Sequence, residues 1–389
     1  MFLVFLSVSG ISVKAEGNAG SYSSEAYVLM EASTGTVIDA KNPDKQLRPA
    51  SITKIMTLLL IFEAIDSGKL QYDDSVVVSE HAASMGGSQV FLEPNETQTV
   101  NDMIKCISIA SANDASVAMA EHIAGSEEQF VQMMNEKAAQ LGMNSTHFVN
   151  CYGLDTDGHY TTAMDVALMS RELITKHSDI FRYSTVWMDS ITHITRKGSS
   201  EFGLSNTNKL LKAYQGITGL KTGSTGLAKY CLSATARRND MDMIAVIMAA
   251  PDTKTRFKEA AALLNYGFGN SSIYRHNTQE LSFPMIPLQD GVENFVSIRP
   301  ESDFSYLCLK GEKPEAITYE VTTEENCKAP VTFGQVLGSI RYLYEGKVIG
   351  TVNLVSVKEF EKASFGDMIL KTLQMFFSQK EIISTETDI

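Results

Sequence analysis

The sequence predicts an α/β domain closed by its own first and last strands, followed by a small all-β domain and an amphipathic helix at the C-terminus. Strand patterns lie near both ends of the first 266 residues, and helical patterns fill the stretch between them. From residue 279 onward the pattern changes to short alternating strands separated by turn residues. We therefore expect the helices to be inserted between the strands of one sheet.

The first 15 residues predict a signal peptide. An apolar stretch leads to Val13, Lys14 and Ala15, a small-residue pattern that suits cleavage after Ala15. The positively charged beginning of a signal is missing, which is typical of a truncated start or of a signal recognised through its amino terminus. A buried first strand or helix is the alternative. We expect an exported protein.

Two hairpins and a set of helices are expected in the first domain, at residues 16–275. The hairpins pair 27–31 with 36–39 and 230–236 with 243–248. The helices share apolar residues at helical spacing and cover 52–65, 101–124, 126–141, 162–175 and 252–266. Thr162 and Asp165 have the spacing of a capping box, which marks a helix start.

The all-β domain is expected at residues 276–360, and a tail follows at 361–389. Its strands are predicted at 296–298, 316–321, 335–338 and 347–354. In the tail, a helix over 363–380 has one narrow polar stripe made by Ser364, Asp367, Lys371, Gln374 and Ser378. The wide apolar remainder is too interrupted to span a bilayer but suits a helix lying on a membrane surface. The alternative is a terminal helix docked on the β domain.

The composition excludes several kinds of function. With 389 residues, 44% hydrophobic and 20% charged, the chain is an ordinary globular protein of two or three domains. A net charge of −13 argues against a nucleic-acid partner. Five cysteines without C-x-x-C spacing argue against a metal site and against a dense disulfide framework, while a pairing of Cys308 with Cys327 stays open. No metal or cofactor is expected.

The helix at 52–65 raises the first chemical hypothesis, because Lys54 begins a run that is apolar all round. Ser51 and Lys54 are three residues apart and lie on the same helix face. A nucleophilic serine with a lysine base would explain them, and the lysine must then be neutral for part of the cycle, which burial and a second cation both favour. The alternative is a lysine that extends out of the core.

Two further motifs supply what such chemistry needs. Ser111 and Asn113 interrupt an apolar helix, where Asn113-Asp114 favours a break, and they offer a hydroxyl and an amide to a cleft. The second cation is Lys221, in a strand-type segment with Thr222 and Gly223. S-x-x-K, S-x-N and K-T-G each occur once, in this order, and the triple is the signature of penicillin-binding proteins and class A β-lactamases.

On these motifs the sequence resembles the low-molecular-mass penicillin-binding proteins that are serine-type D-alanyl-D-alanine carboxypeptidases. The similar segments run across nearly the whole chain and include RPASITKIMT, SMGGSQVFLEP, IASANDASVAMAEHIAG and GLKTGSTGLAKYCLSATA. The resemblance implies a transpeptidase-like domain whose antiparallel sheet carries helices on both faces. A departure occurs at Cys151-Tyr152, where relatives often show a Pro-containing pair, and we expect it to affect a loop and not the chemistry.

The resemblance also implies roles for individual residues. Ser51 would be the acylated nucleophile, Lys54 its base, and Ser111 a proton relay. Substrate binding would involve the amide of Asn113, the carboxylate-binding Lys221 and Thr222, the closely approached Gly223, the backbone N–H of Ser224, and Arg256 near the carboxylate end. The N–H groups of Ser51 and Ser224 would form the oxyanion hole. A solvated helix position is the alternative for Arg256.

The implied reaction is hydrolysis of the terminal D-Ala-D-Ala bond of a peptidoglycan stem peptide, with β-lactams as inhibitors. A β-lactamase would need a glutamate with its water; Glu201 and Asn206 only faintly echo that loop. A D,D-endopeptidase or transpeptidase would keep the same residues and differ in the group that accepts the acyl chain. A non-catalytic sensor that binds penicillin or peptidoglycan is the remaining alternative.

Overall fold

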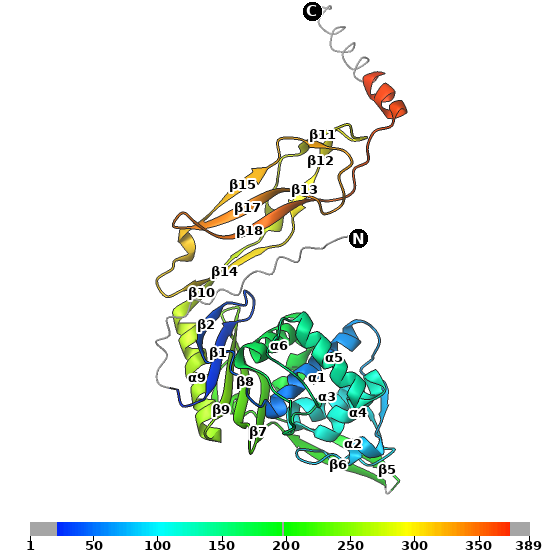
Figure 1. Cartoon of the computed structure of the whole chain (residues 1–389), viewed down its shortest axis with the longest axis vertical. Helices are drawn as coiled ribbons and strands as arrows, with labels where there is room; N and C mark the ends of the chain where they lie inside the picture. The colour runs from blue at the N-terminus through cyan, green and yellow to red at the C-terminus, as the bar shows by residue number, and fades with distance from the viewer. Residues whose placement is uncertain (1–21, 197, 374–389) are drawn as a thin grey trace, which may run out of the picture. The chain divides into compact units, whose positions relative to one another are not determined.

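The computed structural model describes residues 22–196 and 198–373 of the chain. Its contacts divide the chain between Ser271 and Ser272 into two compact units (Figure 1). The expected signal peptide at 1–15 lies outside the described residues.

The first unit is organised around a five-stranded antiparallel sheet in the order β2-β1-β9-β8-β7. Its strands are β1 (Ala26–Glu31), β2 (Val37–Lys41), β7 (Ile217–Thr225), β8 (Lys229–Arg238) and β9 (Met241–Ala250). β1 pairs with β9 over its whole length, so the first strand closes on the last, as predicted. Both predicted hairpins are confirmed, and β7 is left at the edge of the sheet.

Helices cover both faces of this sheet, as the fold class predicts. α9 (Thr253–Asn270) packs against β8 and β9 on one face, and α6 (Ala163–Lys176) packs against β1 and β9 on the other (Figure 1). The α6 side also carries α1 (Lys54–Asp66), α4 (Asn113–Ala124) and α5 (Glu127–Gln140). The predicted start of α6 is confirmed, since the Thr162 side chain accepts a hydrogen bond from the N–H of Asp165.

Two expected helices begin or break differently from the prediction. The stretch before α1 is a 3-10 turn, η1 (Ala50–Thr53), so Lys54 is the first residue of the α-helix proper. The prediction of a single helix over 101–124 is wrong. It is divided into α3 (Val100–Lys105), a π-helical turn η2 (Cys106–Ala110) and α4, because Ser111 adopts left-handed backbone angles, with φ at 63°. The break lies where Asn113-Asp114 indicated one.

Several short elements carry no strong sequence pattern. β3 (Ser75–Val77) pairs with β4 (Thr97–Thr99), and β5 (Met188–Thr195) pairs with β6 (Gly198–Ser205). The short helices are α2 (Glu80–Ala83), η3 (Ser178–Ile180), α7 (Phe181–Ser184) and α8 (Leu210–Ala213). The β5–β6 hairpin is rich in Ser and Thr, which explains why alternation of apolar residues did not mark it.

The second unit is all-β, as predicted, with more strands than the sequence indicated. Its three sheets have the orders β10-β14, β12-β11-β16 and β13-β18-β17-β15. The strands are β10 (Ser271–His276), β11 (Ile286–Gln289), β12 (Phe295–Val296), β13 (Ile298–Pro300), β14 (Phe304–Leu309), β15 (Ile317–Thr323), β16 (Cys327–Lys328), β17 (Val336–Tyr344) and β18 (Lys347–Ser356), with short turns η4 (Thr278–Glu280) and η5 (Pro314–Ala316).

Two strand predictions in this unit need correction. The strand expected at 296–298 is two strands, because β12 and β13 pair with different partners. The strand expected at 335–338 continues to Tyr344. Cys308 and Cys327 are buried in different hydrophobic clusters, and no disulfide joins these two described residues.

The described part of the tail is a helix over residues 365–373. Ser364 caps it, because its Oγ accepts a hydrogen bond from the N–H of Asp367. The Lys371 ammonium donates to the Gly291 carbonyl at 2.7 Å and to Asn294 Oδ1 at 2.8 Å. The apolar side chains of this helix are exposed, namely Phe365, Met368, Ile369, Leu370 and Leu373. Gln374 and Ser378, two members of the expected polar stripe, lie outside the described residues. No helix within 22–196 or 198–373 is both long and apolar enough to cross a membrane.

Candidate active site

Lys54 is fully buried and makes three polar contacts at the start of α1. Its Nζ lies 3.4 Å from Ser51 Oγ, 2.5 Å from Asn113 Oδ1 and 2.7 Å from the carbonyl oxygen of Tyr152. The alternative of a lysine extending into solvent is therefore wrong. Ser51 and Lys54 meet as the three-residue spacing predicts, and α4 brings Asn113 to the same point.

The environment of Lys54 favours its neutral form. Burial lowers the pKa of Lys54 to about 7, and the Cys151 thiol and the Asp114 carboxylate act in the opposite direction. The sequence predicted that Lys221 would also lower this pKa. The charges of the two lysines oppose each other, because burial, then the charges of Lys54 and Arg256, hold the pKa of Lys221 well below the ordinary lysine value.

Lys221 and Ser111 form the second polar contact of the site. The Lys221 Nζ donates to Ser111 Oγ at 2.8 Å and to the Thr222 carbonyl at 3.2 Å, and the lysine is fully buried. Ser111 reaches this position from the left-handed turn between η2 and α4, a conformation that costs a non-glycine residue about 1 to 3 kcal/mol. The local strain thus places a hydroxyl beside the amine of Lys221.

β7 carries the K-T-G motif along the edge of the sheet. Thr222 Oγ1 lies 2.5 Å from Thr207 Oγ1, and Ser224 is exposed. Gly223 passes so close to η1 that an added Cβ would lie 2.7 Å from the backbone nitrogen of Ser51. The motif therefore requires glycine here for a close approach between β7 and Ser51.

Arg256 supports β7 from α9. Its side chain is buried and donates to the carbonyl oxygens of Gly223 at 2.9 Å and Cys231 at 3.2 Å. Its guanidinium also lies over the rings of Tyr230 and Phe257. The solvated helix position considered for this residue is wrong.

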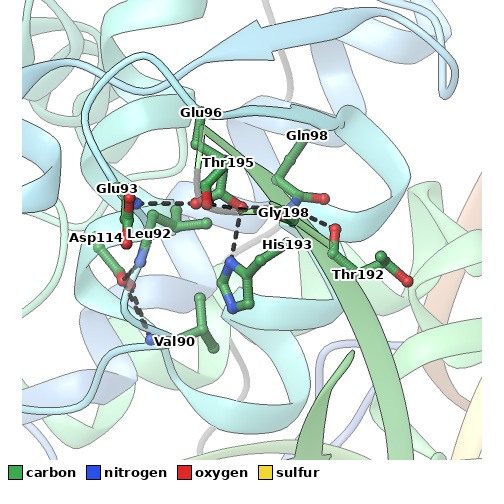
Figure 2. Close-up of polar contacts among 10 residues, drawn as sticks. All are labelled: Val90, Leu92, Glu93, Glu96, Gln98, Asp114, Thr192, His193, Thr195 and Gly198. Atoms are coloured by element: carbon green, nitrogen blue, oxygen red, sulfur yellow. Dashed lines mark hydrogen bonds and ion pairs between the residues drawn. The ribbon is translucent and has the colours of Figure 1, made fainter. Parts of the chain in front are cut away.

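The sequence reasoning missed Asp114, which follows Asn113 on α4. Its buried carboxylate accepts hydrogen bonds from the N–H groups of Val90 and Leu92, which ties the SMGGSQVFLEP segment to α4 (Figure 2). On the same segment, Gly86 accepts a hydrogen bond from Asn113 Nδ2 at 2.7 Å. Asp114 thus holds the segment against which the amide of Asn113 is oriented. In the sequence, only the resemblance of the SMGGSQVFLEP segment to the family pointed to this contact.

A neighbouring polar cluster joins β4 to the β5–β6 hairpin. Buried Glu96 contacts His193 Nδ1 at 2.7 Å and accepts a hydrogen bond from Gln98 Nε2 at 2.7 Å (Figure 2). Gln98 donates a second hydrogen bond to the Thr192 carbonyl. The same hairpin holds Glu201, which accepts a hydrogen bond from Ser190 at 2.7 Å and is exposed. This placement gives the β-lactamase-type glutamate no support.

The loop at 150–155 contacts the site more closely than the sequence predicted. Tyr152 contributes its carbonyl oxygen to Lys54, and a Cβ added to Gly153 would lie 1.9 Å from the carbonyl oxygen of Ala50. Asp155 accepts a hydrogen bond from Thr225 Oγ1 at 2.9 Å, which joins the loop to the end of β7. The departure at Cys151-Tyr152 therefore lies against Lys54 and not in a remote loop.

No group of three metal-binding side chains occurs among the residues that the structure describes. The arrangement offers a serine, two buried amines, a second hydroxyl at Ser111 and a strand edge. These are the components of nucleophilic acyl transfer through a serine ester.

Two family models match the chain. Residues 12–252 match the model described as D-alanyl-D-alanine carboxypeptidase. Residues 268–362 match the C-terminal domain of penicillin-binding protein 5. The two matches fall on the α/β unit and the all-β unit.

Similar proteins support the same grouping. The chain is 41% identical to D-alanyl-D-alanine carboxypeptidase DacF of Bacillus subtilis, over 91% of this chain and 90% of the relative. It is 30% identical to DacC of Escherichia coli, over 97% and 94%. Among solved structures, penicillin-binding protein 5 of Haemophilus influenzae has a TM-score of 0.75 at 30% identity, covering 88% of this chain and 99% of that one.

Proposed function

This chain belongs to the D-alanyl-D-alanine carboxypeptidase family of serine-type hydrolases, and from that premise we propose which residues carry out the reaction. The enzyme removes the terminal D-alanine from a peptidoglycan stem peptide. The contact of the fully buried Lys54 Nζ with Ser51 Oγ carries the assignment of base and nucleophile. No other described serine has this contact with that lysine.

The neighbours of Lys54 fit a neutral amine. An NH2 group has two hydrogens and one lone pair, and the carbonyl oxygens of Asn113 and Tyr152 accept the two hydrogens. The lone pair is then directed to Ser51 Oγ. In the acylation step Lys54 takes the hydroxyl proton, and Oγ attacks the carbonyl carbon between the two D-alanines. The C–N bond breaks, and the departing nitrogen takes the proton that Lys54 had accepted, relayed through Ser111, so that Lys54 returns to its neutral form.

The substrate is held by the edge of β7. Lys221 and Thr222 bind the terminal carboxylate, and Arg256 keeps β7 in place through the Gly223 carbonyl. Asn113 binds the substrate amide. The oxyanion is stabilised by the N–H groups of Ser51 and Ser224, and a single such donor contributes about 3 kcal/mol in other enzymes.

Water completes the cycle by hydrolysing the serine ester: Lys54 accepts a proton from the attacking water and returns it to the departing Ser51 Oγ. β-Lactams acylate members of this family, and Ser51 is the residue at which we place the adduct. In a β-lactam the leaving group stays attached to the acyl chain, so the adduct is expected to persist. The reaction requires no metal or cofactor.

A transpeptidase outcome is the second candidate. The chain has a TM-score of 0.60 and 26% identity to a structure described as a mutant of the Streptomyces K15 DD-transpeptidase, which it covers to 99%. The same residues would then pass the acyl group to an amine in place of water. Product analysis in the presence of an added amine, such as glycine, separates the two outcomes.

We also propose a location for the enzyme. Family members act on peptidoglycan, outside the cytoplasmic membrane, which requires export. The tail helix holds the second unit through Lys371 and leaves its apolar side chains exposed, which suits a helix on a membrane surface. The all-β unit at 276–360 then acts as a spacer between the catalytic unit and the membrane.

The deciding experiment is mass spectrometry of the protein and its Ser51→Ala variant after incubation with a peptide ending in D-Ala-D-Ala. We expect release of one D-alanine by the parent and none by the variant. Absence of release by the parent, with penicillin still bound to Ser51, would support the sensor alternative and overturn the carboxypeptidase assignment for this chain.

A further inference from the structure

The peptide unit between Ala50 and Ser51 is restrained from two sides. Its carbonyl oxygen accepts a hydrogen bond from Thr53 Oγ1 at 2.9 Å, and Gly153 packs against that same oxygen. On the other side, Gly223 of β7 lies against the nitrogen of Ser51. Ala50 has φ at 49°, in the left-handed region that side chains other than glycine avoid, so the unit depends on such restraints.

The restraint on the carbonyl determines the direction of the neighbouring N–H. A trans peptide unit is planar, and its C=O and N–H point in opposite directions. Holding the Ala50 oxygen on the side of Thr53 and Gly153 therefore holds the Ser51 N–H on the side of β7. This is the direction that an oxyanion-hole donor needs if Ser224 of β7 supplies the second N–H.

His159 is the residue behind Thr53. The N–H of Val149 donates to His159 Nδ1 at 2.9 Å, so Nδ1 must present its lone pair. The proton of the neutral ring is then on Nε2, which lies 2.9 Å from Thr53 Oγ1. Nε2–H donates to the hydroxyl oxygen, and the hydroxyl hydrogen is left for the Ala50 carbonyl. The three groups form one directed chain of hydrogen bonds.

The surroundings keep the imidazole in this form. His159 and Thr53 are both buried. Burial, then the positive charges of His147 and Arg48, lower the pKa of His159 to about 4, against the effect of the Asp155 carboxylate. A protonated ring would direct Nδ1–H at the N–H of Val149, which is a contact between two donors. At neutral pH the chain from His159 to Ala50 is therefore intact.

We propose that His159, acting through Thr53 and the Ala50 carbonyl, is a positioning residue that aligns the Ser51 N–H for oxyanion stabilisation. The inference rests on the proposed role of Ser51 as nucleophile and oxyanion donor. His159 does not touch the substrate. Its effect is expected on the step in which negative charge develops, and not on the binding of the intact peptide.

The test compares Thr53→Val, His159→Leu and His159→Gln with the parent in the full chain. The glutamine is a conservative replacement, because Oε1 can accept from Val149 and Nε2 can donate to Thr53. His147→Gln is the matched control, since His147 is exposed and its Nδ1 contacts only the Gly158 carbonyl among the hydrogen bonds described. The readouts are the acylation rate with benzylpenicillin and the dissociation constant of an acylaminoboronic acid, whose tetrahedral adduct places an oxygen in the oxyanion hole.

We expect Thr53→Val and His159→Leu each to slow acylation about tenfold and to raise the dissociation constant of the boronic acid about tenfold. The reason is that a misaligned N–H donor stabilises the oxyanion less well. KM for the peptide should change little, His159→Gln should recover most of the loss, and His147→Gln should match the parent. Thermal unfolding of each variant sets a working temperature at which it is folded, and Thr53→Val carries the test if His159→Leu does not fold.

Parent-like acylation in folded His159→Leu or Thr53→Val would overturn the proposal, as would equal losses in His159→Leu and His159→Gln. Benzylpenicillin acylation does not require release of D-alanine. A parent that is acylated but does not hydrolyse the peptide would therefore refute the proposed carboxypeptidase function and leave this test intact.

Discussion

Lys54 shows how single residues determine the chemistry of this site. Three oxygen atoms surround its nitrogen, and two of them are carbonyl oxygens that can only accept hydrogen bonds. A protonated Lys54 would direct its third hydrogen at Ser51 Oγ and could not take the hydroxyl proton. The neutral form is therefore the active one.

The pH dependence of acylation follows from this. The pKa of Lys54 is lowered to about 7, so the neutral fraction, and with it the acylation rate constant, rises as pH increases through about 7. Below that pH the rate constant should fall about tenfold per pH unit. Stopped-flow acylation with benzylpenicillin between pH 5 and 9 measures this, with the unfolding midpoint recorded at each pH as the control. A flat profile would show that Lys54 is not the base.

The sequence predicts which side chains form the site better than it predicts which backbone groups contribute to the site. Ser51, Lys54, Ser111, Asn113 and Lys221 stand out by residue type and spacing, and the structure brings them together. The contribution of Tyr152 is a carbonyl oxygen, which every residue has, and Ala50 acts through its peptide unit. No residue type marks these roles, and the resemblance supplied only the segments in which they lie.

At the level of elements, strong periodicity predicted the long helices and the central hairpins. α5, α6 and α9 begin within one residue of their expected starts, whereas α4 begins at Asn113, inside the single helix expected over 101–124. The failures share a physical cause. The β5–β6 hairpin is polar, and the break at Ser111 depends on a left-handed turn that tertiary contacts stabilise. The local pattern of apolar and polar residues carries little information about a polar hairpin or about a turn stabilised by tertiary contacts.

The position of β7 provides a test at this scale. Arg256→Leu would remove two hydrogen bonds from α9 and leave the carbonyls of Gly223 and Cys231 without that donor, at a cost of about 1 to 3 kcal/mol for each buried group. We expect kcat/KM for the D-Ala-D-Ala peptide to fall at least about tenfold, because β7 carries Lys221 and Thr222, the residues proposed to bind the carboxylate.

Arg256→Lys is the matched variant, because it keeps the charge and loses the planar fork of donors. It should show an intermediate loss in the same steady-state assay. Parent-like kcat/KM in a folded Arg256→Leu variant would contradict a role for Arg256 in holding β7.

The molecule as a whole combines a catalytic unit, a β unit and a tail with different surface character. The net charge is −13, and the tail stripe contains a single described lysine, which is bound to Gly291 and Asn294. Membrane contact through the tail would therefore depend on its apolar side chains and not on attraction to anionic lipids.

Vesicle binding tests this expectation. Replacing Phe365 and Leu370 with Ser should reduce sedimentation with phosphatidylcholine vesicles at least about tenfold, since burying each side chain contributes about 1.5 to 3 kcal/mol. Binding of the parent should persist at high salt. Val348→Ser is the control, because Val348 is an exposed apolar residue of β18. Equal sedimentation of the double variant and the parent would favour the docked-helix alternative.

The position of Lys54 on α1 has a consequence for the working lifetime of the enzyme. Lys54, the proposed base, is the first residue of a helix in which every side chain from Lys54 to Phe62 is buried in the core. Moving that amine out of register requires opening the core itself, so partial fraying elsewhere in the molecule leaves it in place. Inactivation by heat should therefore coincide with cooperative melting of the first unit, and the enzyme should regain activity whenever that unit refolds.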